Sequence, residues 1–411
     1  MNSFADELNR RLTALREQNL FRELRRVDSA QGPRLETGGK SLLNFSSNDY
    51  LGLANHPALK QAATETVAKF GAGAGASRLI CGSLAPFHEL EESLAAFKQT
   101  ESALTFSTGY AAAVGTITAL CGKDDIIILD KLVHASIVDA AKLSGAKLRI
   151  FAHNDLDDLE IILKWANRRD EFHESPNNEK SGTRITRPSK KCSTIIITES
   201  IFSMDGDAAP LREIVALKEK YGAWLMVDEA HATGIIGKQG RGLANELGVS
   251  GQIEIQMGTL GKALGASGGY ICGARVLVDY LINRARSFIF STAPVPAAAA
   301  AATAGIKLVQ SAEGETRRDQ LRQRIAEFKS EIGNRKLEIP CAIVPVIIGD
   351  EAQAVAAAAK LRDLGIFVPA IRYPTVARGA ARLRITLTAA HSEADVLTLA
   401  HALNQIVNLK S

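Results

Sequence analysis

The chain has 411 residues, of which 46% are hydrophobic and 23% charged, and its formal net charge is only +4. This composition supports a large hydrophobic core, and it lacks the concentrated basic stripe that is typical of a nucleic-acid binder. No uninterrupted apolar run reaches the ~20 residues that a membrane span needs, the N-terminus has no apolar signal core, and the five cysteines lack metal-type spacing. We therefore expect a cytoplasmic protein that binds neither nucleic acid nor a membrane and holds no metal.

The elements predicted along the chain alternate between strand and helix. Residues 1–28 are predicted to form a helical arm, because leucines recur at near-helical spacing. Helices are predicted at 86–97, 135–143 and 211–221, the last with Pro210 before it and Gly222 after it. The predicted buried strands are 103–106, 126–129, 148–151, 194–198, 223–227, 253–257 and 269–272. This alternation favours an α/β fold with a parallel sheet.

The pattern changes after Pro296. A long helix at 313–335 precedes an α+β unit with strands near 342–348, 367–371 and 383–387 and helices at 351–364 and 392–409. We place a large domain at 46–299 and a small domain at 300–411, and we expect an arm at 1–45 to pack with the small domain. A polar insert at about 170–191, which contains the one basic run, is predicted to be a surface loop without a catalytic role.

Two neighbouring strand ends carry polar side chains. Asp228 ends the apolar run in AWLMVDEAH and His231 follows it, while Thr259 and Lys262 lie in MGTLGKALG after the next strand. Open α/β sheets bind ligands at this carboxyl edge, and flanking glycines let the backbone pass close to a bulky ligand. Alone, the lysine would be a surface residue and the aspartate a cap. Together they favour pyridoxal 5'-phosphate (PLP), which needs a lysine for its Schiff base and a carboxylate for its ring nitrogen.

Two further motifs agree with a phosphate-bearing cofactor. In FSTGYAAAVG a helix is predicted to begin near Gly109 and Tyr110, where backbone amides can bind phosphate. His134 also follows a strand end and could stack on a ring, although an isolated histidine would be interpreted as structural.

Two other motifs are rejected. GAGAGAS at 71–77 follows a helix-like segment rather than a strand, which argues against a dinucleotide loop. GASGG at 265–269 matches G-x-S-x-G, but a strand follows it where a hydrolase elbow needs a helix.

With these residues assembled, the chain resembles the α-oxoamine synthases, which are fold-type I PLP enzymes. The resemblance rests on NFSSNDYLGLANHP (44–57), FSTGYAAAVG (106–115), LDKLVHASI (129–137), TESIFSMDGDAAPL (198–211), MVDEAHATG (226–234), GTLGKALG (258–265) and RLRITLTAAH (382–391). It implies a large domain with a mostly parallel seven-stranded sheet, a smaller C-terminal α+β domain, and a homodimer with shared active sites.

The resemblance also implies residue roles. Lys262 would hold the cofactor and transfer protons, Asp228 would pair with the pyridine nitrogen, and His231 with the phenolic oxygen. His134 would stack on the ring and contact the substrate. The rest of the cofactor site would be Gly109, Tyr110, Glu199, Ser203, Thr259 and, reaching the other subunit's cofactor, Thr292. The substrate site would contain Asn48 and Arg384 for the amino-acid carboxylate, and Thr375 and Arg22 for the acyl group.

Within this family, FAHNDLDDL (151–159) and MDGDAAPL (204–211) favour a member that acts in biotin biosynthesis. Such an enzyme condenses L-alanine with a pimeloyl thioester of CoA or acyl-carrier protein and releases CO2 and the thiol. A condensing enzyme for glycine or serine, such as glycine C-acetyltransferase, is the alternative. The loop at 372–378 departs from the family pattern at Tyr373 and Arg378. The length and head group of the acyl substrate therefore stay open. A non-catalytic subunit would lack Lys262, and a transcription regulator would need a DNA-binding module.

Overall fold

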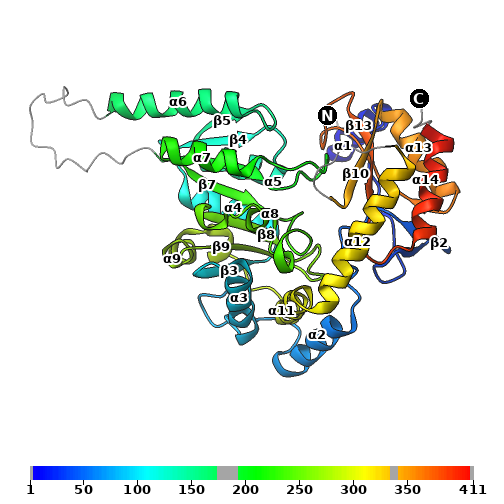
Figure 1. Ribbon diagram of the computed structural model, residues 1–411, viewed down its shortest axis with the longest axis horizontal. Helices are drawn as coiled ribbons and strands as arrows, with labels where there is room; N and C mark the ends of the chain where they lie inside the picture. The colour runs from blue at the N-terminus through cyan, green and yellow to red at the C-terminus, as the bar shows by residue number, and fades with distance from the viewer. Residues whose placement is uncertain (1–2, 174–192, 334–340, 408–411) are drawn as a thin grey trace, which may run out of the picture. The chain divides into compact units, whose positions relative to one another are not determined.

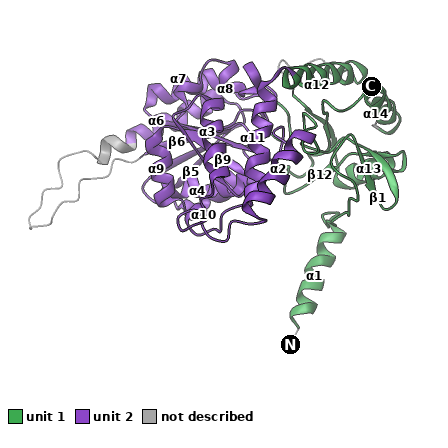
Figure 2. Ribbon diagram, turned by 90° about the horizontal axis from the view of Figure 1, so that it is seen from below, with its two compact units in different colours: residues 1–56, 203–207, 313–411 green, residues 57–202, 208–312 purple. Residues whose placement is uncertain are grey.

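The computed structural model describes residues 3–173, 193–333 and 341–407 (Figure 1). The chain forms two compact units, which Figure 2 colours separately. The larger unit contains residues 57–202 and 208–312, and the smaller unit contains residues 1–56, 203–207 and 313–411. Within the described residues, no helix is both long enough and apolar enough to cross a membrane.

A seven-stranded sheet forms the centre of the larger unit. Its strands are β3 (Ser102–Phe106), β4 (Ile126–Asp130), β5 (Lys147–Phe151), β6 (Thr194–Glu199), β7 (Trp224–Asp228), β8 (Ile255–Thr259) and β9 (Gly269–Gly273). The order across the sheet is β3-β9-β8-β7-β6-β4-β5, and only β9 runs antiparallel to its neighbours, β3 and β8. The prediction of seven strands in a mostly parallel sheet is therefore confirmed.

Helices cover both faces of this sheet, which explains why its strands are continuous apolar runs. One face packs against α4 (Gly109–Leu120), α5 (Ala135–Ser144) and α9 (Arg275–Arg284). On the other face, α6 (Leu156–His173) and α7 (Leu211–Tyr221) pack on β4 and β7. The remaining helices of this unit are α2 (Pro57–Phe70), α3 (Ala85–Lys98), α8 (Leu243–Glu246), α10 (Arg286–Ile289) and α11 (Pro296–Gln310). Two 3₁₀ turns lie at Lys238–Gly240 and Ser250–Gln252.

The smaller unit contains two three-stranded sheets. One has the order β1 (Arg34–Thr37), β2 (Lys40–Asn44) and β11 (Ile366–Phe367), and the other has the order β10 (Ile343–Gly349), β13 (Ala381–Thr386) and β12 (Ala370–Ile371). Because β2 pairs with β11, backbone hydrogen bonds join the N-terminal and C-terminal parts of the chain. The helices of this unit are α1 (Phe4–Glu17), α12 (Ala312–Glu331), α13 (Glu351–Asp363) and α14 (Glu393–Val407).

For two elements of the smaller unit, the predicted residue range was wrong. The N-terminal helix does not continue to residue 28, because Asn19 adopts a left-handed φ of 56° and the N–H of Leu20 turns back to the carbonyl of Leu15 at 2.8 Å. The strand expected at 367–371 is two short strands in different sheets. Pro369 separates them, and proline has no N–H to continue a ladder.

The boundaries of the units also differ from the predicted domains. Residues 46–56 and 203–207 group with the smaller unit, and α11 groups with the larger one because it packs on α2 and α3. The insert predicted at 170–191 lies outside the described residues beyond His173, where α6 ends.

Candidate active site

A cavity of about 180 Å³ lies in the larger unit at the carboxyl ends of β6, β7 and β8 and the beginnings of α4 and α5. This is the edge at which α/β sheets bind ligands. Eleven residues line the cavity, and eight of them are predicted site residues: Gly109, Tyr110, His134, Glu199, Asp228, His231, Thr259 and Lys262.

Lys262 reaches the cavity from the loop that follows β8. Its Nζ lies 2.8 Å from Nε2 of His231, so the imidazole can accept a hydrogen bond from the amine. Two backbone hydrogen bonds of 2.9 Å fix the loop, one from the N–H of Leu260 to Gly268 and one from the N–H of Ala266 to Leu260. The amine is therefore directed into the cavity by a tightly bonded turn.

Asp228 is the last residue of β7, and its side chain is buried. Its Oδ1 accepts a hydrogen bond from the N–H of Ala230 at 2.9 Å. Burial raises the pKa of Asp228, whereas the positive charge of Lys262 and the Ala230 N–H lower it. Glu199 is its partner across the β6–β7 ladder. A buried carboxylate of this kind can hold a proton on a heterocyclic nitrogen.

His134 is the N-cap residue of α5. Its Nδ1 accepts a hydrogen bond from the N–H of Ser136 at 3.2 Å and lies 2.8 Å from the Ser136 hydroxyl. Burial lowers the pKa of His134, although the charge of Asp228 acts in the opposite direction. A neutral imidazole is therefore favoured here, and its flat ring can stack on an aromatic ligand.

The cavity also contains groups suited to a phosphate. Gly109 and Tyr110 are the first two residues of α4, so their N–H groups have no carbonyl one turn earlier. Thr108 caps this helix with its side chain, and the hydroxyl of Thr259 donates to the carbonyl of Gly268 at 3.0 Å. A Cβ built on Gly269 would lie only 2.6 Å from Gly109 backbone atoms, so this close approach requires glycine.

A second polar cluster lies in the smaller unit around Arg384 on β13, which is 5% exposed. Its Nε donates to the carbonyl of Ser203 at 2.7 Å, and its Nη1 donates to the hydroxyl of Thr386 at 3.0 Å. Both terminal nitrogens donate to Oδ1 of Asn48 at 3.2 Å. All these acceptors are neutral, and among the described residues no carboxylate pairs with Arg384. The guanidinium can therefore attract an anionic ligand.

Three of the other predicted residues lie outside these clusters. Thr292 is exposed, forms a β-bridge with Ser77 and does not line the cavity. Arg22 and Thr375 are exposed in loops of the smaller unit. Ser203 belongs to the smaller unit, where its carbonyl is part of the Arg384 cluster.

Sequence reasoning missed three residues that line the cavity, namely Ser136, Ala230 and Met257. Met257 lies two residues before Thr259, so both side chains point to the same face of β8. Ser136 and Ala230 act through backbone N–H groups that bond to His134 and Asp228. Strand periodicity could have found Met257, but residue type gives no signal for the other two.

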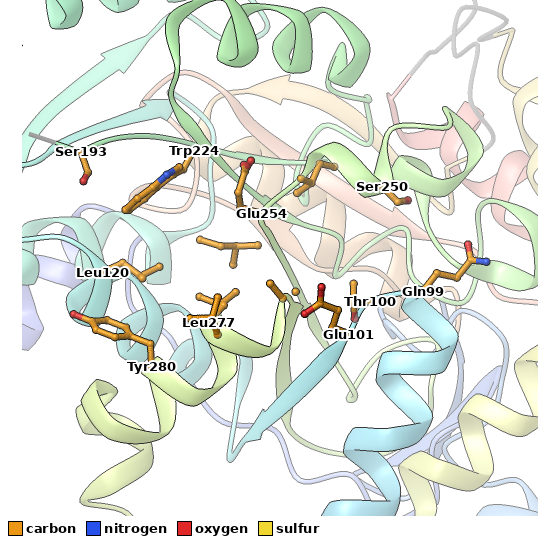
Figure 3. Close-up of a pocket in the computed structure, with 16 residues that line it drawn as sticks. Gln99, Thr100, Glu101, Leu120, Ser193, Trp224, Ser250, Glu254, Leu277 and Tyr280 are labelled. Atoms are coloured by element: carbon orange, nitrogen blue, oxygen red, sulfur yellow. The ribbon is translucent and has the colours of Figure 1, made fainter. Parts of the chain in front are cut away.

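A larger cavity, of about 720 Å³, opens at the opposite, amino edge of the same sheet (Figure 3). Trp224 begins β7 here, whereas Asp228 ends the strand at the other edge. Figure 3 shows Trp224, Leu120, Leu277 and Tyr280 around the hollow, with Glu254 nearby. None of its lining residues is a lysine or histidine. Volume alone would therefore select an edge that lacks the lysine and histidines of the smaller cavity.

Comparisons with known proteins identify the family and the fold of the chain. The family model described as aminotransferase class I and II matches residues 40–403. An 8-amino-7-oxononanoate synthase of Geotalea daltonii is 46% identical over 399 residues, which cover 96% of this chain and 95% of that protein. A solved serine palmitoyltransferase from S. paucimobilis, with bound PLP–myriocin aldimine, is 28% identical with a TM-score of 0.85 and covers 98% of this chain and 97% of that chain. A solved 8-amino-7-oxononanoate synthase from Francisella tularensis is 28% identical with a TM-score of 0.72, and the match covers 89% of this chain and 98% of that chain.

Proposed function

The chain belongs to the aminotransferase class I and II family, and we propose that it is a PLP-dependent acyltransferase that makes 8-amino-7-oxononanoate for biotin biosynthesis. The reaction condenses L-alanine with a pimeloyl thioester and releases CO2 and the free thiol carrier. The observation that carries the proposal is the contact of Lys262 with His231 beside buried Asp228, in a chain similar over its whole length to synthases of this name.

The residues around the cavity fit PLP. Lys262 offers an amine for the aldehyde, and buried Asp228 offers a carboxylate for the ring nitrogen. The N–H groups of Gly109 and Tyr110, at the start of α4, would bind the phosphate, and the Thr259 hydroxyl would join them by turning away from the Gly268 carbonyl. When bound, PLP would delocalise the negative charge that develops on the amino-acid α-carbon.

Each side chain then has a defined task. The Lys262 amine would take the α-proton of alanine, and His231, at 2.8 Å, would orient this amine and hydrogen-bond the phenolic oxygen of the cofactor. Asp228 would keep the ring nitrogen protonated, and His134 would stack on the ring. Glu199 and Ser203 would complete the wall of the cofactor site.

The Arg384 cluster would bind the carboxylate of alanine. The guanidinium is held by Asn48 and Ser203, so its orientation is fixed before an anion arrives. Orienting the carboxylate sets the direction of the Cα–H bond that Lys262 attacks. Thr375 and Arg22 would face the acyl group. The α-carbon attacks the thioester carbonyl, the thiol leaves, and the resulting β-keto acid loses CO2.

We further propose that two chains form a dimer in which Thr292 reaches the cofactor of the second subunit, since it is exposed and does not line the cavity of its own chain. A cytoplasmic location and the absence of nucleic-acid and membrane partners remain predictions from the sequence.

The proposed reaction can be tested by product analysis. Purified protein with PLP is incubated with alanine, glycine or serine and with pimeloyl, acetyl and palmitoyl thioesters. Mass spectrometry should detect 8-amino-7-oxononanoate from alanine and the pimeloyl thioester. Faster turnover of glycine or serine would instead support a different condensing enzyme of the family.

A further inference from the structure

The residue after Asp228 is a second buried acid that the proposed reaction does not use. Glu229 forms an ion pair with Lys98, the last residue of α3, and the two side chains are 0% and 1% exposed, respectively. Glu229 directly follows the last residue of β7, and unlike Asp228 it does not line the cavity. A fully buried ion pair directly behind the cofactor cavity calls for an explanation, because burying both charges is costly.

The ion pair joins three segments of the larger unit. Besides Glu229, the Lys98 amine contacts the carbonyl of Arg241 at 2.5 Å. The other oxygen of Glu229 accepts a hydrogen bond from the N–H of Ala244 at 2.9 Å. A Cβ on Gly242, whose φ is 113°, would lie 2.4 Å from the Glu229 carboxylate. The end of α3, the loop at 241–244 and the end of β7 therefore meet at this carboxylate.

The backbone of Glu229 transmits this anchoring to the cavity. Its N–H donates to the carbonyl of Met257 on β8 at 2.8 Å. Its carbonyl accepts from the N–H groups of Ala232 at 3.0 Å and Thr233 at 2.8 Å, which closes the turn that carries His231. A shift of Glu229 would therefore displace both Asp228 and His231.

We propose that Lys98 and Glu229 are a positioning pair for the cofactor, which holds the Asp228–His231 turn in place and keeps the charge behind it balanced. This inference rests on the proposed binding of PLP. Burial is the main influence that raises the pKa of Asp228; Lys262 and His134 lower it, and Glu229 raises it. Lys98 offsets the charge of Glu229, so that Asp228 is the net anion presented to the cofactor.

The pair can be tested with Lys98→Met, Glu229→Gln and the double variant, each prepared with PLP. The readout is the pH midpoint of the visible absorbance of the bound cofactor. Lys98→Met leaves a negative charge that favours the protonated cofactor, so the midpoint should rise. Glu229→Gln leaves the positive charge of Lys98 unpaired, so the midpoint should fall. Each shift should be roughly 0.5–1 pH unit, the size expected for one unpaired charge in protein of effective dielectric ~20. The double variant should return close to the wild-type midpoint.

The chain offers a matched control at the other end of β7. Lys218 and Glu254 form an ion pair with side chains that are 9% and 39% exposed, and Glu254 also accepts a hydrogen bond from the N–H of Leu225 at 2.8 Å. Glu254 borders the larger cavity shown in Figure 3. Lys218→Met and Glu254→Gln should lower thermal stability without moving the midpoint.

The positioning role has its own readout, which is the dissociation constant of PLP. Both single variants should weaken PLP binding by roughly tenfold or more, and the double variant should recover part of the loss, because neighbouring changes couple. If Lys98→Met does not fold, Lys98→Arg keeps the charge and should keep the wild-type midpoint.

The possible outcomes distinguish a failure of the proposed function from a failure of the role proposed for Lys98 and Glu229. A wild-type protein that does not bind PLP would refute the proposed function itself. A wild-type protein that binds PLP, with single variants that share the wild-type midpoint or shift it in the same direction, would overturn the role of the pair. A Lys98→Arg midpoint displaced as far as that of Glu229→Gln would also overturn it.

Discussion

The two polar clusters of the molecule differ in how their charges are compensated. In the larger unit, burial raises the pKa of Asp228 and the charge of Lys262 lowers it, and the Lys262 amine contacts His231. In the smaller unit, Arg384 carries a permanent charge and its acceptors are neutral groups such as Asn48. The first cluster can exchange protons, whereas the second can only attract and orient an anion. We therefore propose proton transfer for the cluster of the larger unit and substrate orientation for the cluster of the smaller unit.

The largest expected loss of activity follows from removing the Lys262 amine of the first cluster. Lys262→Ala should lower turnover by roughly 10³-fold or more, because both the cofactor anchor and the proton-transfer group are lost. Since the side chain ends in a cavity, the melting temperature without cofactor should change little. Product formation followed by mass spectrometry measures the loss, and turnover within tenfold of wild type would contradict the assignment.

Asp228→Asn is the next largest change, because it preserves shape and removes the charge. Losing one partner of a buried charge pair costs roughly 3–5 kcal/mol, which corresponds to about 10²–10⁴-fold in turnover. PLP should still bind, since Lys262 and the amides at the start of α4 remain. Absorbance titration with PLP checks binding, and steady-state kinetics check turnover. Near-normal turnover would show that Asp228 does not act on the ring nitrogen.

Arg384→Lys tests the second cluster by keeping the charge and removing the planar fork. Hydrogen bonds to a charged group are worth about 1.5–3 kcal/mol, so alanine affinity should fall roughly 10–100-fold, with the KM for the thioester unchanged. The matched control is Arg382→Lys on the same strand, because Arg382 already pairs with Asp205 at 2.6 Å. Spectral titration with alanine gives the dissociation constants. Equal constants for wild type and Arg384→Lys would exclude Arg384 as the carboxylate anchor.

The smallest expected effect is on the pH dependence of folding stability, and it arises from His391 in the smaller unit. His391 donates from Nε2 to the carbonyl of Asn44 at 3.1 Å and accepts at Nδ1 from the N–H of Thr388 at 3.0 Å, so it is neutral. Burial lowers the pKa of His391 to about 4 from the usual 6.5. The unfolded chain therefore binds the proton first, and the stability this residue confers is complete above pH 6.5 and is lost as pH falls toward 4.

Between pH 7 and pH 5 this loss should amount to about 2 kcal/mol in the free energy of unfolding. Urea titrations of wild type and His391→Gln at both pH values measure it. The variant should be less stable than wild type at pH 7 and should lose about 2 kcal/mol less on acidification. Equal losses in both proteins would show that His391 is not the group responsible.

Those residues that end or directly follow an apolar strand were predictable from sequence. Asp228 and Lys262 follow runs whose hydrophobicity marks buried strands, and the parallel order of those strands brings the two residues to one edge. Contacts between distant segments were not predictable, because periodicity says nothing about them. Lys98 meets Glu229 across 131 residues, and Arg384 meets Asn48 across 336. The early end of α1 at Glu17 depends on a left-handed Asn19, which the leucine spacing did not reveal.

Lys262 is the residue on which the proposed activity depends most directly, and one labelling measurement tests its role. The purified protein is saturated with PLP, reduced with borohydride and digested, and the modified peptide is identified by mass spectrometry, with Lys262→Arg as the control. We predict a single pyridoxyl group on Lys262 and none in the variant. A pyridoxyl group on another lysine, or equal labelling of the variant, would contradict the proposed active site.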